Sequence, residues 1–210
     1  MKKLLAPIVA FLAVGTAAGV AQQPSASPAS SMRAEQVIAS WKAKPAEVAR
    51  TMIKKYGQPQ EVTANRLIWH ANGPWKFTEL VNEEIPHSFP MPHNDMLYQS
   101  IAYRIEPDDA DDLIQYDGSV ILERTKGEIA ARCDKEEANF LAINLAHEIA
   151  TGKRTVDDAR RFYAESVQTM MKTGKPNEYL KGFRFTPSSG DQGDKDKPFG
   201  PAGTTGEKKH

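Results

Sequence analysis

Two histidines and an aspartate that lie close together in the sequence are the side chains best suited to metal chemistry. His87, His93 and Asp95 lie in the proline-rich segment 82–95, and His70 lies shortly before it. Imidazole nitrogens and carboxylate oxygens are the ligands that zinc and related transition metals take. The segment therefore suggests a metal-dependent hydrolase-like enzyme, in which His70 could add a further donor. Its spacing follows no common metal motif, so a packed loop with two polar histidines is the alternative.

A second place for chemistry is Cys133, the single cysteine of the chain. We expect it at the end of a strand, just before a helix whose field can lower the pKa of a thiol. With His147 as base and Asn144 as orienting amide on that helix, it could act as a nucleophile. A small buried side chain is the alternative. The pair His147-Glu148 is not a zinc-protease motif, because Thr151 stands where the second histidine is required.

Composition and missing motifs exclude several classes of function. Residues 1–21 carry two of the 27 basic side chains and none of the 27 acidic ones, so the remaining chain has a net charge of −2. No basic excess is left to bind nucleic acid or an anionic bilayer. The sequence also lacks a Gly-x-Ser-x-Gly elbow, a phosphate-binding glycine loop and a Cys-x-x-Cys pair. We therefore expect no nucleic-acid partner and, for a non-enzymatic protein, no cofactor.

The first 21 residues have the features of a signal peptide. Lys2 and Lys3 precede an apolar run over 4–14, and small residues stand at 19–21, where signal peptidase cleaves. The apolar run is too short to span a membrane, and we expect no stable membrane span once the signal peptide has been cleaved. The sequence therefore predicts a periplasmic or secreted protein. A single cysteine cannot form an internal disulfide in that compartment.

The rest of the chain reads as one domain with polar ends. Residues 22–31 have no large apolar side chain and are typical of a flexible linker. Residues 187–210 are rich in Gly, Asp, Lys and Pro and are expected to be disordered. The span 32–186 is long enough for a single domain with its own core.

Hydrophobic periodicity within this span predicts an α+β fold. Apolar residues at helical spacing indicate two short N-terminal helices before Gly57 and two long C-terminal helices. The first long helix begins near Asp134, in a capping-box pattern, and the second begins at Thr155. The prolines of segment 82–95 predict a long irregular loop. About five strands should form a mostly antiparallel sheet covered on one face, over residues 67–70, 75–81, 97–105, 119–124 and 128–133.

Aromatic residues near that loop support a second kind of function. Trp69, Trp75 and Phe89 would form a contact surface if they remained exposed on the sheet face beside residues 85–95. In this hypothesis the protein is a non-enzymatic binding module, and its partner is an envelope protein or a cell-surface ligand. Burial of the two tryptophans would count against it.

Several short motifs also carry a resemblance to other proteins. The motifs are KYGQP at 55–59, GPWK at 73–76, PMPH at 90–93, DGSV at 117–120, ERTKGE at 123–128 and ARCDKEEAN at 131–139. On these motifs the chain resembles, over about residues 48–163, a group of uncharacterised exported bacterial proteins. The resemblance implies an exported single domain and no particular activity, cofactor or site.

Overall fold

The computed structural model describes residues 28–199, with side chains from Arg33 onward. The predicted signal peptide, residues 1–21, lies outside the described residues. Of the predicted linker, only residues 28–31 are described, and they are already helical, because α1 begins at Pro28. Proline suits the first turn of a helix, where its missing N–H would have no partner.

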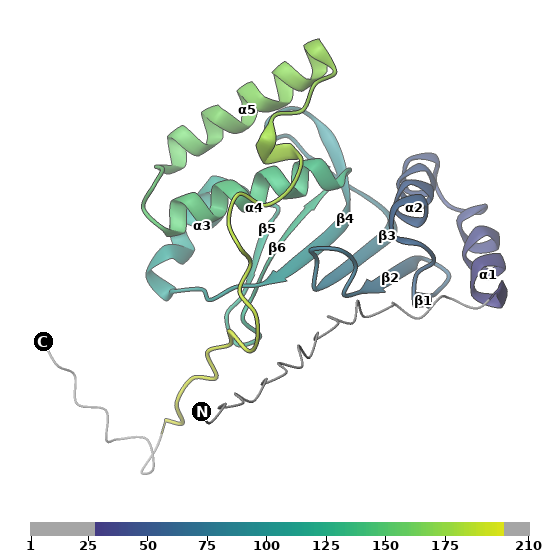
Figure 1. The fold of residues 1–210 in the computed structure, drawn as a ribbon, viewed down its shortest axis with the longest axis horizontal. Coiled ribbons are helices and arrows are strands. Elements are labelled where there is room, and N and C mark those ends of the chain that lie inside the picture. Colours follow the sequence, from purple (N-terminus) through teal and green to yellow (C-terminus); the bar gives the residue numbers. More distant parts are fainter. Residues whose placement is uncertain (1–27, 200–210) are drawn as a thin grey trace, which may run out of the picture.

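Within the described residues, the fold is a six-stranded antiparallel sheet with five α-helices, in the strand order β1-β2-β3-β4-β6-β5 (Figure 1). The strands are β1 (Glu61–Val62), β2 (Arg66–His70), β3 (Phe77–His87), β4 (His93–Ala102), β5 (Val120–Glu123) and β6 (Glu128–Cys133). The helices are α1 (Pro28–Ile38), α2 (Ala43–Tyr56), α3 (Ala110–Tyr116), α4 (Glu136–Ala150) and α5 (Val156–Thr173). This confirms the α+β class, with β1 added to the strands expected from the sequence.

The helices cover one face of the sheet. Leu80 pairs with Leu97 across β3 and β4, and Ile101 pairs with Ile129 across β4 and β6. Alternate residues share a face, so these side chains form one apolar surface. α1 and α2 pack on its β1–β3 end, while α4 packs on β4 and β6 with α5 outside it (Figure 1).

Both tryptophans proposed for a binding surface lie in this core. Trp69 and Trp75 are each only 1% exposed. The indole N–H of Trp69 donates to the Gly57 carbonyl at 2.9 Å, and that of Trp75 donates to Glu136 Oε1 at 2.6 Å. The expectation of exposed tryptophans is therefore wrong, because their rings fill the space between the sheet and the helices.

The predicted loop 82–95 is mostly a hairpin. β3 and β4 pair as far as His87 opposite His93, with a register shift between Leu80 and Ile85. β2 accompanies β3 only as far as Val81. Pro86 therefore lies in a part of β3 that pairs on one side only, where a missing N–H is tolerated. The prolines did not exclude a strand here, because the hairpin extends beyond the rest of the sheet.

The C-terminal segment passes back over the molecule to the turn between β5 and β6. The backbone N–H of Asp194 donates to the Arg124 carbonyl at 3.0 Å, and the Arg124 guanidinium binds the Asp194 carboxylate at 2.6 Å. Gly127 has a φ of 68°, and a Cβ there would lie 2.2 Å from the Gln192 backbone. Residues 191–196 are therefore held against the turn, contrary to the disordered tail expected from residue 187, while residues 200–210 lie outside the description.

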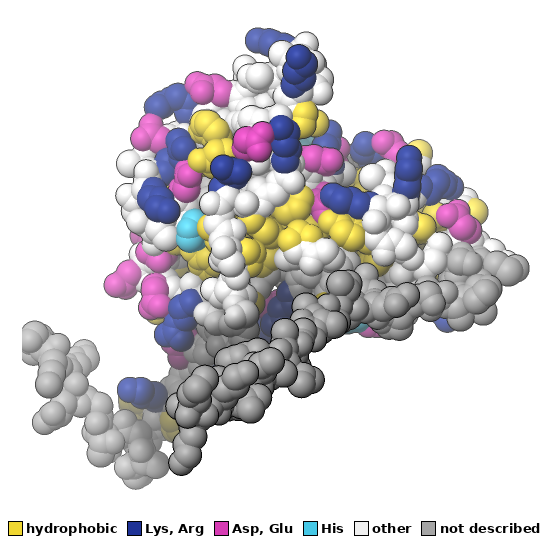
Figure 2. All heavy atoms as spheres, in the orientation of Figure 1, with side chains coloured by type: hydrophobic (Ala, Val, Ile, Leu, Met, Phe, Trp, Pro, Cys, Tyr) yellow, Lys and Arg dark blue, Asp and Glu magenta, His cyan; other side chains and the backbone are white. Residues whose placement is uncertain are grey.

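Basic and acidic side chains of the described residues are interspersed over the helix-covered face (Figure 2). Among residues 28–199, none of the helices has the length and apolar character needed to cross a bilayer.

Candidate metal centre

The end of the β3–β4 hairpin brings together the three residues that the sequence suggested as metal ligands. His87 is the last residue of β3, His93 is the first residue of β4, and the two face each other in the register. Their rings lie 4.9 Å apart. Asp95 follows two residues after His93 and therefore projects from the same side of the strand.

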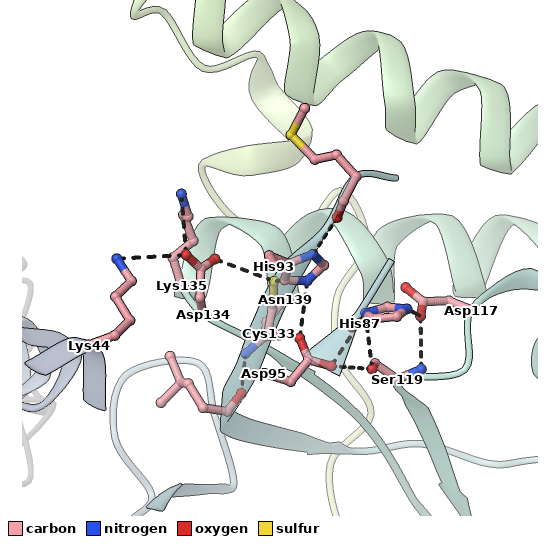
Figure 3. A network of polar contacts seen from close by, with 12 residues as sticks. Lys44, His87, His93, Asp95, Asp117, Ser119, Cys133, Asp134, Lys135 and Asn139 are labelled. Carbon is pink, nitrogen blue, oxygen red and sulfur yellow. Dashed lines mark hydrogen bonds and ion pairs between the residues drawn. The ribbon is translucent and has the colours of Figure 1, made fainter. Parts of the chain in front are cut away.

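Each of the two imidazoles approaches one oxygen of the Asp95 carboxylate (Figure 3). His93 Nε2 lies 3.1 Å from Asp95 Oδ1, and His87 Nδ1 lies 3.3 Å from Asp95 Oδ2. One donor atom from each of the three residues can be chosen so that all lie within 4.8 Å of one another. The predicted metal-ligand set is thus assembled in space as well as in sequence.

Each imidazole has its other nitrogen directed at a second acceptor. His93 Nδ1 lies 2.8 Å from the Met91 carbonyl, and His87 Nε2 lies 3.5 Å from Asp117 Oδ1. Such outer partners fix the tautomer and orientation of a metal-binding histidine. The other two nitrogens, Nε2 of His93 and Nδ1 of His87, face Asp95, and Nδ1 of His87 also lies 3.3 Å from the Ser119 hydroxyl.

Asp95 is fully buried, with 0% of its surface exposed. Ser119 Oγ donates to Asp95 Oδ2, but Oδ1 has no hydrogen-bond partner within residues 28–199. The 3.1 Å separation between His93 Nε2 and Oδ1 is an ion-pair contact, and the same nitrogen lies 3.4 Å from Cys133 Sγ. A buried carboxylate oxygen left in this state is costly unless a cation compensates it.

In the absence of metal, that cation is the His93 imidazolium. Asp95 chiefly raises the pKa of His93, with further contributions from Cys133 and the Met91 carbonyl, to about 11. Burial raises the pKa of the neighbouring Asp117 carboxyl, although the Ser119 N–H and His87 oppose the shift. The centre therefore has two buried carboxylates and needs positive charge.

Cys133 joins this cluster from the end of β6. Its Sγ lies 3.4 Å from His93 Nε2, and the residue is 7% exposed. Burial raises the pKa of the thiol, while His93 lowers it. The register pairs Cys133 with Leu97, two residues beyond Asp95 on β4. The Cys133 thiol is thus adjacent to the imidazole of His93, and not to that of His147, which the sequence suggested.

The expected partners of Cys133 have other roles. His147 stacks on Phe185 with ring centroids 4.0 Å apart, and its Nδ1 lies 3.0 Å from the Tyr103 hydroxyl. The Asn144 side chain binds backbone groups of the C-terminal segment, at Tyr179, Gly182 and Arg184. The thiol site proposed with these two residues is therefore wrong.

Two further sequence-selected residues lie outside the centre. His70 Nε2 pairs with Glu61 Oε1 at 2.5 Å on the β1–β2 edge and adds no donor. Phe89 is half-buried against Tyr163, 5.1 Å away, and the Arg160 guanidinium lies 4.0 Å over its ring. Phe89 thus packs the hairpin turn onto α5 and does not form a free contact surface.

A cavity of about 200 Å³ adjoins the cluster between the hairpin turn, the start of α4 and one side of α5. His93 and Cys133 form part of its wall. The side chains of His87 and His93 are each 17% exposed, so the centre is shielded but not sealed.

Sequence reasoning missed Asp117 and Ser119. Residue types at 117–119 predict only the start of a strand, and this segment precedes β5, which is far from the hairpin in the sequence. Ser119 reaches Asp95 because β5 pairs with β6 and β6 with β4. The strand order, which the sequence left open, decides this contact.

Comparisons with known proteins identify no relative of this chain. No protein-family model matches the chain, and neither a curated protein nor a solved structure matches it significantly. The function must therefore be inferred from the centre itself.

Proposed function

We propose that this protein is a metal-dependent enzyme of hydrolytic type that binds zinc, or a metal of similar preference, through His87, His93 and Asp95. The observation that carries the proposal is the orientation of the two imidazoles. Each has one nitrogen engaged by an outer acceptor and the other facing the buried Asp95 carboxylate.

The spacing of the donor atoms supports a tetrahedral ion. Bonds of about 2.0–2.2 Å to nitrogen and oxygen imply ligand atoms about 3.3–3.6 Å apart. The separations of 3.1 Å to Asp95 Oδ1 and 3.3 Å to Asp95 Oδ2 are close to this edge length, and one donor atom from each of the three residues lies within 4.8 Å of the others. A divalent ion would replace the proton on His93 and, with it, the ion pair between that imidazolium and Asp95 Oδ1.

Three protein ligands favour a catalytic role over a structural one. Structural zinc is usually enclosed by four protein ligands, whereas catalytic zinc has three and a water. Zinc held here would acidify that water and polarise a substrate carbonyl. His93 would place the reaction beside the cavity, and Ser119 would hold the Asp95 carboxylate in position. Export to the periplasm or the medium, inferred from residues 1–21, belongs to the same proposal.

The first test is the metal content of the exported protein, purified without chelator and measured by mass spectrometry. We expect about one zinc per chain in the unaltered protein. His87→Ala with His93→Ala should lower the content at least about tenfold, since even outer-shell changes reduce affinity by about that factor. His70→Ala is the matched control, because it removes an imidazole outside the centre. An unaltered protein that takes up no zinc, manganese or iron would contradict the proposal.

The second arm measures hydrolysis of simple nitrophenyl esters by the same proteins. Activity should disappear with a chelator, return with zinc and be missing from the double variant. Cys133→Ala should keep its metal and part of its activity. Activity that resists chelation but is lost in Cys133→Ala would assign the chemistry to the Cys133–His93 pair instead.

A further inference from the structure

The cavity beside the centre has an apolar wall made by elements distant in the sequence. α5 contributes Tyr163, Val167 and Met170, the hairpin turn contributes Met91, and the short helix after α5 contributes Leu180. Apolar walls bind apolar groups because burial removes those groups from water.

Besides His93, the charged residues that line the cavity are Asp134, Lys135 and Glu137, at the start of α4. Asp134 is paired with Lys135 at 3.6 Å and with Lys44 at 3.8 Å. A ligand group that packs against the apolar wall formed by α5, the hairpin turn and Leu180 is expected to be uncharged.

The size of the cavity limits what it can hold. An apolar protein cavity of about 150 Å³ accommodates a benzene ring. The space here, about 200 Å³, suits a phenyl group or an aliphatic chain of about six carbons.

The cavity and the metal ligands share His93. Its ring lines the cavity, while its Nε2 faces Asp95. A group that fills the cavity would thus present its attached carbonyl next to the metal position.

On the basis of the proposed function, we propose that the substrate is an ester or amide whose uncharged apolar acyl group occupies this cavity. The scissile carbonyl would lie at the mouth next to His93. Water adds to the acyl carbon, the carbon–oxygen or carbon–nitrogen bond breaks, and the leaving alcohol or amine takes the proton. The products are a carboxylic acid with a short apolar chain and that alcohol or amine.

Aliphatic hydroxamic acids test this inference, because their head group chelates zinc and their tail probes the cavity. We would measure binding to the zinc-loaded protein by calorimetry, from acetohydroxamic to octanohydroxamic acid. Affinity should rise about fourfold per methylene until about six carbons and then level off. Equal affinities along the series would overturn the acyl proposal while leaving the metal centre in place.

A filling variant makes the test specific. Val167→Trp should abolish the gain with chain length but leave acetohydroxamic acid binding and zinc content unchanged. Met170→Trp on the same wall is a second filling variant, should the first fail to fold. Gln168→Trp is the matched control, since its side chain lies on the exposed side of α5. A length dependence that persists in both filled variants would overturn the assignment of this cavity, and a protein without zinc would overturn both proposals.

Discussion

Glu136, the first residue of α4, is a buried carboxylate that binds side chains of α2 and of the segment before β3. It accepts hydrogen bonds from Tyr56 on α2 at 2.5 Å and from Trp75 before β3 at 2.6 Å, and it also pairs with Lys55. Only 5% of the residue is exposed. The core has two apolar clusters, one under α1 and α2 and one under α4 and α5; Trp75 belongs to the second, and Tyr56 packs against both.

Replacing Glu136 with alanine should lower the free energy of unfolding by about 3 kcal/mol. The variant leaves the Tyr56 hydroxyl and the Trp75 N–H buried without their acceptor. Urea unfolding followed by tryptophan fluorescence measures the loss. Glu165→Ala, at an exposed position of α5, should change stability by less than about 0.5 kcal/mol. Equal effects of the two substitutions would show that the contacts of Glu136 do not stabilise the fold.

The metal ligands could be identified from residue type alone, but their surroundings could not. Two histidines and an aspartate in one short segment are sufficient to suggest coordination chemistry. Ser119 and Cys133 reach the centre only through the pairing of β4, β5 and β6, and register depends on contacts across the sheet. For Trp69 and Trp75 the prediction from residue type was wrong, because residue type does not distinguish a buried ring from an exposed one.

At the level of elements, the two long helices begin differently. Thr155 precedes α5, and its hydroxyl accepts from the Asp158 N–H at 3.2 Å, as the sequence predicts. Before α4 the N-cap is Lys135, which has no side-chain cap. The expected cap, Asp134, pairs with Lys44 and Lys135 beside the cavity. Local sequence predicts a cap well only where no tertiary ion pair competes for the side chain.

Thr155→Ala should destabilise the protein by about 1 kcal/mol, because the Asp158 N–H loses its acceptor. The change should appear as a lower urea midpoint with an unchanged slope. Thr169→Ala, at an exposed position of the same helix, is the control for the loss of a hydroxyl. If both variants unfold at the same midpoint, the cap contributes nothing to stability.

The β3–β4 hairpin is the element least accessible to sequence reasoning. Its prolines predict irregular backbone, yet Pro86 lies opposite Asn94 in a paired strand. The rule that proline excludes a strand holds for strands that pair on both sides, whereas this stretch of β3 pairs with β4 alone. Helices, whose period repeats over many residues, were predicted in the right order.

At the scale of the whole molecule, the C-terminal segment completes the core. Phe183 packs edge-on against Trp75 at 5.0 Å, and Phe185 stacks on His147 at 4.0 Å. Burial lowers the pKa of His147, with Lys153 adding to the shift and Glu148 opposing it. The neutral ring is therefore the form that holds the segment.

Stability should depend on the charge of His147. Because its folded pKa lies below the unfolded value of about 6.5, the contribution of the neutral ring is present above that pH and is lost as pH falls through the folded pKa. The loss should stay below about 1 kcal/mol, since the ring is partly exposed. His147→Asn keeps an acceptor for Tyr103 and should remove this dependence. Parallel slopes of unfolding free energy for both proteins between about pH 7.5 and pH 5 would contradict the assignment.

The position of all three proposed ligands on one hairpin has a consequence for how the protein matures. His87, His93 and Asp95 are separated by few residues, so little chain entropy is lost when they meet. Binding free energy at such a site is available before distant strands have paired, and it adds to the free energy of folding. A chain that binds the proposed metal would then acquire it during folding, and the ion would stabilise early the end of the hairpin, where β3 and β4 pair only with each other.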